Sequence, residues 1–111
     1  MRKFNRTRGP RISFFKSLAN NLIMKERIET TITRAKEIRP IVERMVSIAK
    51  KQQLASLRSL LEKLPAQSAK KMYFDIGPRY LTRNGGYLRI IKGGKARKRD
   101  AAYVATIEFV K

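Results

Sequence analysis

Apolar residues recur at helical spacing through the first two thirds of the chain and at strand spacing in the last third. A first stripe follows Ser13, a suitable N-cap, and predicts a helix that ends near residues 24–25. A second stripe runs from residue 38 to about residue 50. Pro40 lies inside this second stripe, so it either bends the helix or marks its first turn.

Two further stripes predict helices in the middle of the chain. A leucine stripe over residues 54–64 ends at Pro65, which cannot continue a helix. The next stripe covers residues 68–76 and is followed by Gly77-Pro78, a typical C-terminal stop signal.

Three stretches alternate in polarity with the two-residue period of strands, at residues 27–33, 87–92 and 103–110. The first stretch is rich in β-branched residues and would place Ile28, Thr30 and Ile32 on one face. The last would place Tyr103, Ala105, Ile107 and Phe109 on one face.

Three strands and four helices predict an α+β fold, with the helices packed against a small three-stranded mixed sheet. The 111 residues contain no repeat or internal linker, so we expect a single domain over residues 1–111. Residues 1–12 lack apolar periodicity and contain the breaker Gly9-Pro10. We therefore expect an extended basic N-terminal arm at 1–12 ahead of a globular core at 13–111.

The aromatic residues divide into two groups. One group lies on the periodic apolar faces and is expected in the core; it comprises Phe14, Phe15, Tyr73, Phe74 and Phe109. The other group, Phe4, Tyr80 and Tyr87, has a cation within one or two residues. These three either stack on unpaired bases or pack in the core, and the sequence leaves both alternatives open.

The positive charge is large and unevenly distributed. The chain has 27 Lys and Arg against 8 Asp and Glu, a net charge of +19. Residues 1–16 carry six basic residues, residues 79–99 carry eight, and neither segment has an acid, so fourteen of the nineteen surplus charges lie in two segments. Self-repulsion of this size is tolerated when a polyanion neutralises it, which favours nucleic acid as the partner over an anionic membrane.

The composition excludes most catalytic chemistry. The chain has no cysteine and no histidine, so it lacks disulfides, Ser-His-Asp and Cys-His nucleophiles and most zinc sites. The acids pair with nearby cations at helical spacing (Lys71–Asp75, Asp75–Arg79, Arg34–Glu37), which favours surface ion pairs over an acid–base pair of Glu26 and Glu29.

The stretch "IIKGGKARKRD" at residues 90–100 combines two glycines with five cations but does not fit a nucleotide loop. A P-loop requires G-x-x-x-x-G-K-[ST], whereas Arg89 lies five residues before Gly94, and Ala96 follows Lys95. The sequence instead predicts a basic loop between two strands, in which Gly93 and Gly94 let the backbone turn and approach RNA. We expect no enzyme activity, no cofactor, no metal and no small-molecule substrate.

No apolar run approaches the roughly 20 residues needed to span a bilayer. The first 25 residues lack acids and are rich in arginine, which is also typical of an organellar transit peptide.

Two long segments resemble the bacterial large-subunit ribosomal protein family seventeen. They are "SLANNLIMKERIETTITRAKEIRPIVERMVSIAK" at 17–50 and "IGPRYLTRNGGYLRIIKGGKARKRDAAYVATIEFV" at 76–110, and the least characteristic part is 51–75. The resemblance implies an α+β fold, binding to 23S ribosomal RNA, a position on the solvent side of the large subunit near the exit-tunnel region, and no catalysis. It also covers part of the arginine-rich N-terminus, which argues against a transit peptide.

This sequence departs from the family at the N-terminus and just before the first strand. Family members often carry histidine where this chain has Arg2-Lys3 and Met24-Lys25. Positive charge is retained, so RNA contact is still expected, without any contact that depends on histidine.

The sequence therefore predicts a structural constituent of the large ribosomal subunit, in the cytoplasm or, as the lesser alternative, in an organelle. Its expected partners are 23S rRNA and neighbouring ribosomal proteins, with no membrane and no homo-oligomer. The expected RNA-binding residues are Arg2, Lys3, Arg6, Arg8, Arg11, Lys16, Arg34, Lys36, Arg39, Arg79, Tyr80, Arg83, Asn84, Gly85, Gly86, Tyr87, Arg89, Lys92, Lys95, Arg97, Lys98 and Arg99. The alternatives are a freestanding nucleoid or DNA-compacting protein and a cationic membrane-active protein; the charge lies mostly outside the helices, which counts against the latter.

Overall fold

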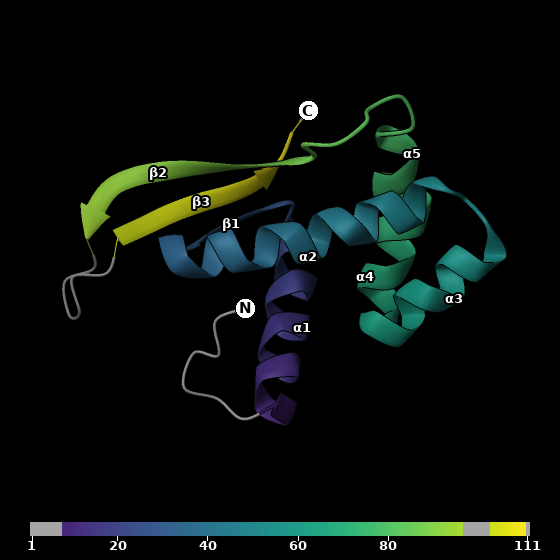
Figure 1. Cartoon of the computed structure of the whole chain (residues 1–111), viewed down its shortest axis with the longest axis horizontal. Coiled ribbons are helices and arrows are strands. Elements are labelled where there is room, and N and C mark those ends of the chain that lie inside the picture. The colour runs from purple at the N-terminus through teal and green to yellow at the C-terminus, as the bar shows by residue number, and fades with distance from the viewer. Residues whose placement is uncertain (1–7, 97–102, 111) are drawn as a thin grey trace.

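The helices cover one side of a three-stranded sheet, and the other side of the sheet faces away from every helix that the structure describes (Figure 1). The computed structural model describes residues 8–96 and 103–110, with side chains from Arg11 to Gly93 and from Tyr103 to Val110. The elements in chain order are α1 (Arg8–Lys25), β1 (Arg27–Thr31), α2 (Ile32–Lys50), α3 (Leu54–Lys63), α4 (Ala66–Lys71), the π turn η1 (Met72–Ile76), α5 (Gly77–Arg79), β2 (Leu88–Ala96) and β3 (Tyr103–Phe109).

The last strand of the chain is the middle strand of the sheet. The strand order is β1-β3-β2, and β3 pairs antiparallel with both neighbours. Ile107 of β3 lies opposite Ile28 of β1 and Ile90 of β2, so three isoleucines form a row across the sheet. The predicted α+β fold is confirmed; the sheet is wholly antiparallel rather than mixed.

Helix α2 crosses beneath the sheet and forms the centre of the core. Ile38, Val42 and Val46 are fully buried on the face of α2 that the apolar stripe predicted. Full burial of each such side chain stabilises the fold by about 1.5–3 kcal/mol, and burial of this kind supplies most of the driving force for folding.

Helix α1 begins at Arg8, so the expected start at Ser13 is wrong and residues 8–12 are helical rather than extended. Gly9-Pro10 lies in the first turn, where a backbone N–H has no intrahelical acceptor and proline is tolerated. The rest of the expected arm, residues 1–7, lies outside the described residues.

The junction between β1 and α2 comes earlier than the alternating pattern predicted. Ile32 is the first residue of α2 and not a strand residue, because Thr31 caps the helix by accepting a hydrogen bond from the backbone N–H of Arg34 at 3.3 Å. Pro40 lies within α2, so it does not mark the first turn.

The helical segment from Ala66 continues through η1 to Arg79, so the expected stop at Gly77-Pro78 is wrong. The backbone N–H of Gly77 donates to the carbonyl of Met72, five residues back, and this π turn accommodates Pro78 in the next position. Gly77 lies against α2: a Cβ added there would be 2.9 Å from the carbonyl oxygen of Ala49 and 3.0 Å from its Cβ. The glycine therefore serves close packing of two helices rather than helix termination.

Replacing Gly77 with alanine should lower the free energy of unfolding by about 1–3 kcal/mol, because the new methyl group must push α2 and α5 apart. This loss opposes the gain of roughly 1 kcal/mol that alanine gives an exposed helix position. Urea denaturation measures it, with Lys70→Ala on the exposed face of α4 as the control. Equal stability of the Gly77 variant and the wild type would contradict the packing role.

Four of the five aromatic residues expected in the core are at least partly buried. Phe15 and Phe109 belong to the core, and Phe14 and Tyr73 pack against it. Phe74 is 64% exposed, so its assignment to the core is wrong. The helix buries Met72 and Ile76, and Phe74 lies midway between them in sequence, on the outer side of the turn.

Candidate nucleic-acid interface

A row of charged residues crosses the sheet on the face opposite the helices. Arg27 of β1 and Arg89 of β2 both lie opposite Glu108 of the central strand. The Nε of Arg27 lies 3.5 Å from Glu108 Oε2, and Arg89 Nε donates to Glu108 Oε1. The Glu108 side chain is 10% exposed, whereas those of Arg27 and Arg89 are 66% and 61% exposed. One shielded carboxylate thus orients two solvent-facing guanidiniums and leaves a net positive charge.

Arg89 was expected in the interface, but Arg27 was not. The sequence signal for Arg27 was present, because the alternation of β1 places it on the face opposite Ile28. Its partner across the sheet could not be identified without the strand order.

The predicted site residue Arg79 forms ion pairs within the protein. Its guanidinium donates to Glu26 and, at 3.2 Å, to Asp75. The hydrogen bond with Glu26 is the main cause that raises the pKa of Arg79. Lys71 also pairs with Glu26, at 3.3 Å, rather than with Asp75 as expected. Arg79 therefore joins α5 to the α1–β1 junction, and only part of its side chain is available to a ligand.

Glu26 has a strained backbone conformation, and the ion pairs of its side chain explain why a glutamate rather than a glycine occupies this position. Its φ is 62°, in the left-handed region that favours glycine, and its N–H closes α1 by donating to the carbonyl of Leu22. A glycine would relieve the strain but would lose the carboxylate that binds Lys71 and Arg79. The hydrogen bond from Arg79 is the largest cause that lowers the pKa of Glu26 below its usual value of 4.5.

Replacing Glu26 with glutamine should destabilise the protein at neutral pH and not at low pH. A carboxyl whose pKa is lowered on folding contributes stability above its usual pKa, and loses that contribution as the pH falls through the folded value. Because the side chain is about one third exposed, solvent screens the pairs and we expect a loss of about 1 kcal/mol at pH 7. Urea denaturation at several pH values should show this difference shrinking below pH 4.5. The exposed Glu29→Gln serves as the control, and a difference that persists in acid would contradict the ion-pair role.

Tyr80 and Tyr87 were expected either to stack on bases or to pack in the core, and they pack. Each is 3% exposed, and their ring centroids lie 5.3 Å apart. The Tyr80 hydroxyl donates to the carbonyl of Val110, and burial is the main cause that raises the pKa of Tyr80. Lys50 Nζ donates to the Tyr87 hydroxyl at 2.8 Å. Base stacking is therefore wrong for both rings; Phe4 lies outside the described residues.

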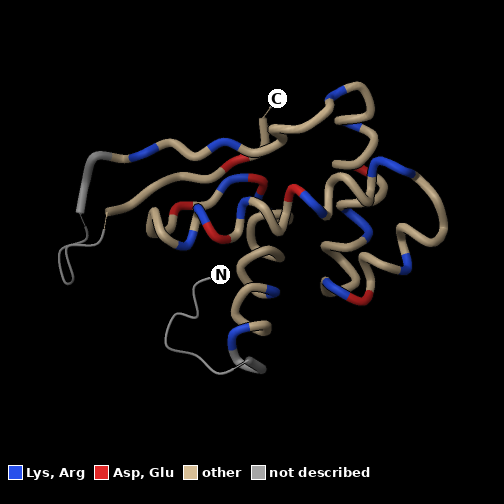
Figure 2. The backbone as a smooth tube through the Cα atoms, in the orientation of Figure 1, with Lys and Arg blue, Asp and Glu red and all other residues tan. Residues whose placement is uncertain are grey.

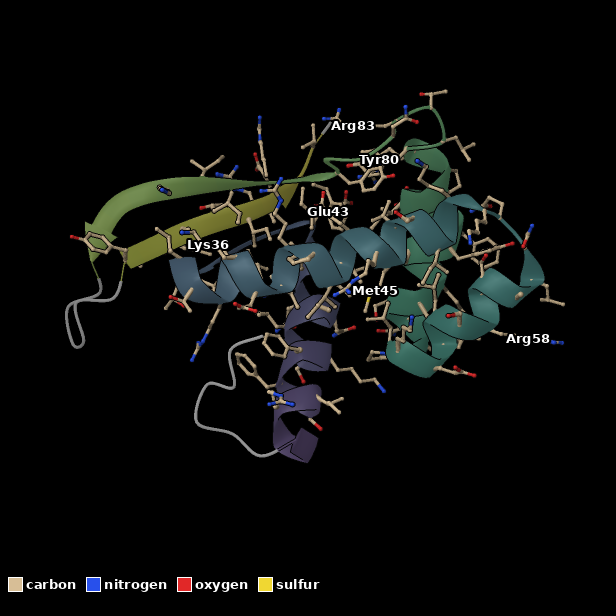
Figure 3. All side chains as sticks on the ribbon, in the orientation of Figure 1. Lys36, Glu43, Met45, Arg58, Tyr80 and Arg83 are labelled. Carbon is tan, nitrogen blue, oxygen red and sulfur yellow. The ribbon has the colours of Figure 1, made fainter. Side chains whose placement is uncertain are left out.

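The loop between α5 and β2 runs along the top of the view in Figure 3, above the C-terminal half of α2, and hydrogen bonds join it to α2. Lys50 Nζ also donates to the carbonyl of Arg83, and Glu43 Oε2 accepts from the backbone N–H of Tyr87 at 3.0 Å. Arg83 Nε donates to the carbonyl of Gly85 at 3.1 Å, which holds the arginine across the loop. Arg83, Asn84, Gly85 and Gly86 are all exposed. The sequence pattern does not predict the anchors Lys50 and Glu43, because only the fold brings them beside the loop.

The glycines of "IIKGGKARKRD" belong to β2, which extends to Ala96, so the expected loop begins later than predicted. The pairing shifts register between Lys92 and Ala96. A Cβ on Gly93 would lie 3.1 Å from the carbonyl oxygen of Val104, so the glycine allows close approach of β3. Lys92 is exposed; the side chains of Lys95, Arg97, Lys98 and Arg99 lie outside the described set.

The remaining predicted residues are on α1 and α2. Lys16 and Lys36 are exposed and Arg11 is half-buried. Arg34 lies over the Phe14 ring, 5.2 Å from its centroid, and Arg39 pairs with Glu43 at 3.4 Å. Arg2, Lys3 and Arg6 are outside the described residues, as is the side chain of Arg8. Apart from the ion-paired Arg79, the predicted cations that the structure shows exposed are thus on β2, on the loop after α5, on α1 and at the start of α2.

Figure 2 shows basic positions along β2 and on the loop between α5 and β2, at the side of the molecule away from α1. Among the described side chains, no group of three His, Cys, Asp or Glu is placed to hold a metal ion. No helix in the described parts of the chain is long and apolar enough to cross a membrane.

These features define a class: a basic α+β protein that presents cations from a sheet face and a tethered loop, without a metal-binding cluster among the described residues. Residues 14–110 match the family model of ribosomal protein L17. The chain belongs to the ribosomal protein L17 family.

Individual relatives agree with this assignment. The chain is 48% identical over 110 residues to a protein of Agrobacterium fabrum called large ribosomal subunit protein bL17, covering 98% of this chain and 77% of the relative. A protein of the same name from a Hydrogenobaculum species is 43% identical over 108 residues, covering 96% of this chain and 92% of the relative. The predicted family is confirmed, and with it the prediction that the protein is not an enzyme.

Proposed function

We propose that the protein is a structural constituent of the large ribosomal subunit that binds folded 23S rRNA through two basic surfaces. The single observation that carries the rRNA-binding role is the concentration of fourteen of nineteen surplus positive charges in two acid-free segments, 1–16 and 79–99. Phosphate contacts supply most of the affinity of such surfaces and fix the orientation of the protein on its RNA.

The first proposed surface, named here the sheet–loop surface, comprises Arg27 and Arg89 on the open face of the sheet and Arg83 and Asn84 on the loop, together with the basic residues from Lys92 to Arg99. Lys92 itself lies on the opposite face of β2 from Arg89. Glu108 supports it by holding Arg27 and Arg89, and Lys50 supports it by holding the loop. Because Glu108 already orients the side chains of Arg27 and Arg89, less conformational entropy is lost when each guanidinium binds a phosphate. The second surface comprises residues 1–16, which include the acid-free start of helix α1 with Arg11 and Lys16.

Equilibrium binding tests the proposal against the DNA-compacting alternative. The protein should bind 23S rRNA with an affinity that falls steeply with salt, and an excess of duplex DNA should compete poorly. Equal competition by DNA, or a protein that sediments free of large subunits in a high-magnesium lysate, would contradict the proposed function. We expect the protein in the cytoplasm with neighbouring ribosomal proteins as further partners.

A further inference from the structure

Between α1, α2 and α3 lies an apolar hollow that borders the second proposed surface and shares Arg11 and Lys16 with it. Its volume is about 380 Å³, and its apolar lining comes from Ile12, Phe15, Ile41 and Met45. In Figure 3 the Met45 side chain extends from α2 into the space between α1 and the α3–α4 pair. The volume lies within the range of roughly 300–1,000 Å³ that is usual for ligand pockets.

Part of this lining is exposed although apolar. Ile12 is 55% exposed on the second turn of α1, while Phe15 and Met45 form the buried floor. An isolated exposed isoleucine is ordinary, but one at the mouth of an apolar hollow marks a place where a ligand can bury it.

The rim of the hollow is basic. Arg11 and Lys16 contribute from α1, and Lys63 contributes from the end of α3, against the single acid Glu62. The rim thus carries three positive charges and one negative charge around an apolar floor. This charge balance favours a ligand that combines a flat apolar body with flanking negative groups, and it disfavours a basic protein segment.

We infer that this hollow receives one unstacked nucleobase of the rRNA, with the phosphates on either side of that nucleotide bound by Arg11, Lys16 and Lys63. The inference rests on the proposed rRNA-binding function and adds a base-binding site next to the second surface, between α1 and α3. Proteins recognise unpaired RNA nucleotides in this way, with the base in apolar contact and the backbone on cations. An apolar side chain of a neighbouring protein is the competing occupant, and the test separates the two.

Cross-linking from the mouth of the hollow identifies the occupant. The photoreactive residue p-azidophenylalanine is placed at position 12, the variant is assembled into large subunits, and the subunits are irradiated. We expect a cross-link to one or two adjacent rRNA nucleotides. The same residue placed at position 54, which is 63% exposed on α3 and does not line the hollow, should not reach those nucleotides.

A cross-link from position 12 to a ribosomal protein, or to nothing in assembled subunits, would overturn the inference and leave the proposed function standing. Failure of the protein to enter the subunit would overturn both. Thermal unfolding of each variant confirms that it is folded before assembly.

Binding measurements give an independent check on the rim. Replacing Lys63 with glutamine should reduce the slope of log affinity against log salt by about 0.7, the value for one phosphate of single-stranded RNA. Lys70→Gln removes the same charge from an exposed site on α4 that does not line the hollow, and should leave the slope unchanged. Ile12→Ser should weaken binding roughly fivefold, since a base contact contributes a factor of that order or more, while Leu54→Ser should not. Equal effects of Lys63→Gln and Lys70→Gln, or of Ile12→Ser and Leu54→Ser, would refute the assignment of the hollow as a nucleobase site.

Discussion

Neutralising the basic end of the β2–β3 hairpin should weaken binding to 23S rRNA by roughly 10²–10³-fold at physiological salt. The variant replaces five cations with glutamine: Lys92, Lys95, Arg97, Lys98 and Arg99. Each phosphate contact contributes about 0.7–0.9 to the slope of log affinity against log salt, so five contacts should lower that slope by about 4. Filter binding across salt concentrations measures both quantities.

A charge-matched variant separates specific contacts from net charge. Lys25, Arg44, Lys51, Arg58 and Lys70 are all exposed and lie outside both proposed surfaces and the rim of the hollow. Replacing these five with glutamine removes the same charge and should change the slope by less than 1. If both variants lose affinity equally, the protein binds RNA as a diffuse polycation, and the sheet–loop surface has no special role.

Replacing Ile107 with alanine should lower the free energy of unfolding by about 2–5 kcal/mol, the largest effect that we expect of any single substitution. Ile107 is fully buried on the middle strand, between Ile28 and Ile90, and its loss leaves a cavity that the sheet and α2 cannot easily fill. Urea denaturation measures the change.

Ile91 provides a control of the same residue type on the same sheet. It is 42% exposed and alternates with the buried positions of β2, so Ile91→Ala should cost less than about 1 kcal/mol. Comparable losses at the two positions would mean that both faces of the sheet are covered, contrary to the open face on which the proposed RNA contact depends.

The periodic parts of the chain were predicted well because burial decides them locally. The stripe from Ile38 to Ala49 and the alternation from Ala105 to Phe109 each match the buried face in the structure. The period of a helix or strand determines which face each residue occupies, so a regular apolar repeat predicts both the element and its buried face.

Errors at element boundaries arose where a local signal had a second explanation. Gly77 looked like a helix stop, but its lack of a side chain serves contact with Ala49, 28 positions earlier in the chain. Thr31 and Ile32 fitted a strand, but the threonine caps a helix. In each case the deciding contact belongs to the tertiary structure or to a cap geometry that residue type alone does not fix.

The candidate site was predicted in outline and revised in detail. Counting charge located the segment 79–99, but it did not distinguish cations that face solvent from those that serve the fold. Arg79 forms an ion pair with Glu26, and Tyr80 and Tyr87 lie in the core. Arg27, which was not predicted, belongs to the proposed surface because Glu108 orients its guanidinium. These distinctions depend on strand order and on contacts between distant segments.

Binding of rRNA through the two basic segments is tested most directly by mapping which peptides of the protein cross-link to RNA when sedimented large subunits are irradiated with ultraviolet light. We expect the cross-linked peptides to come from residues 1–16 and 79–99, with nucleotides of 23S rRNA attached. Cross-links confined to α3 and α4, or a protein that never sediments with the subunit, would contradict it.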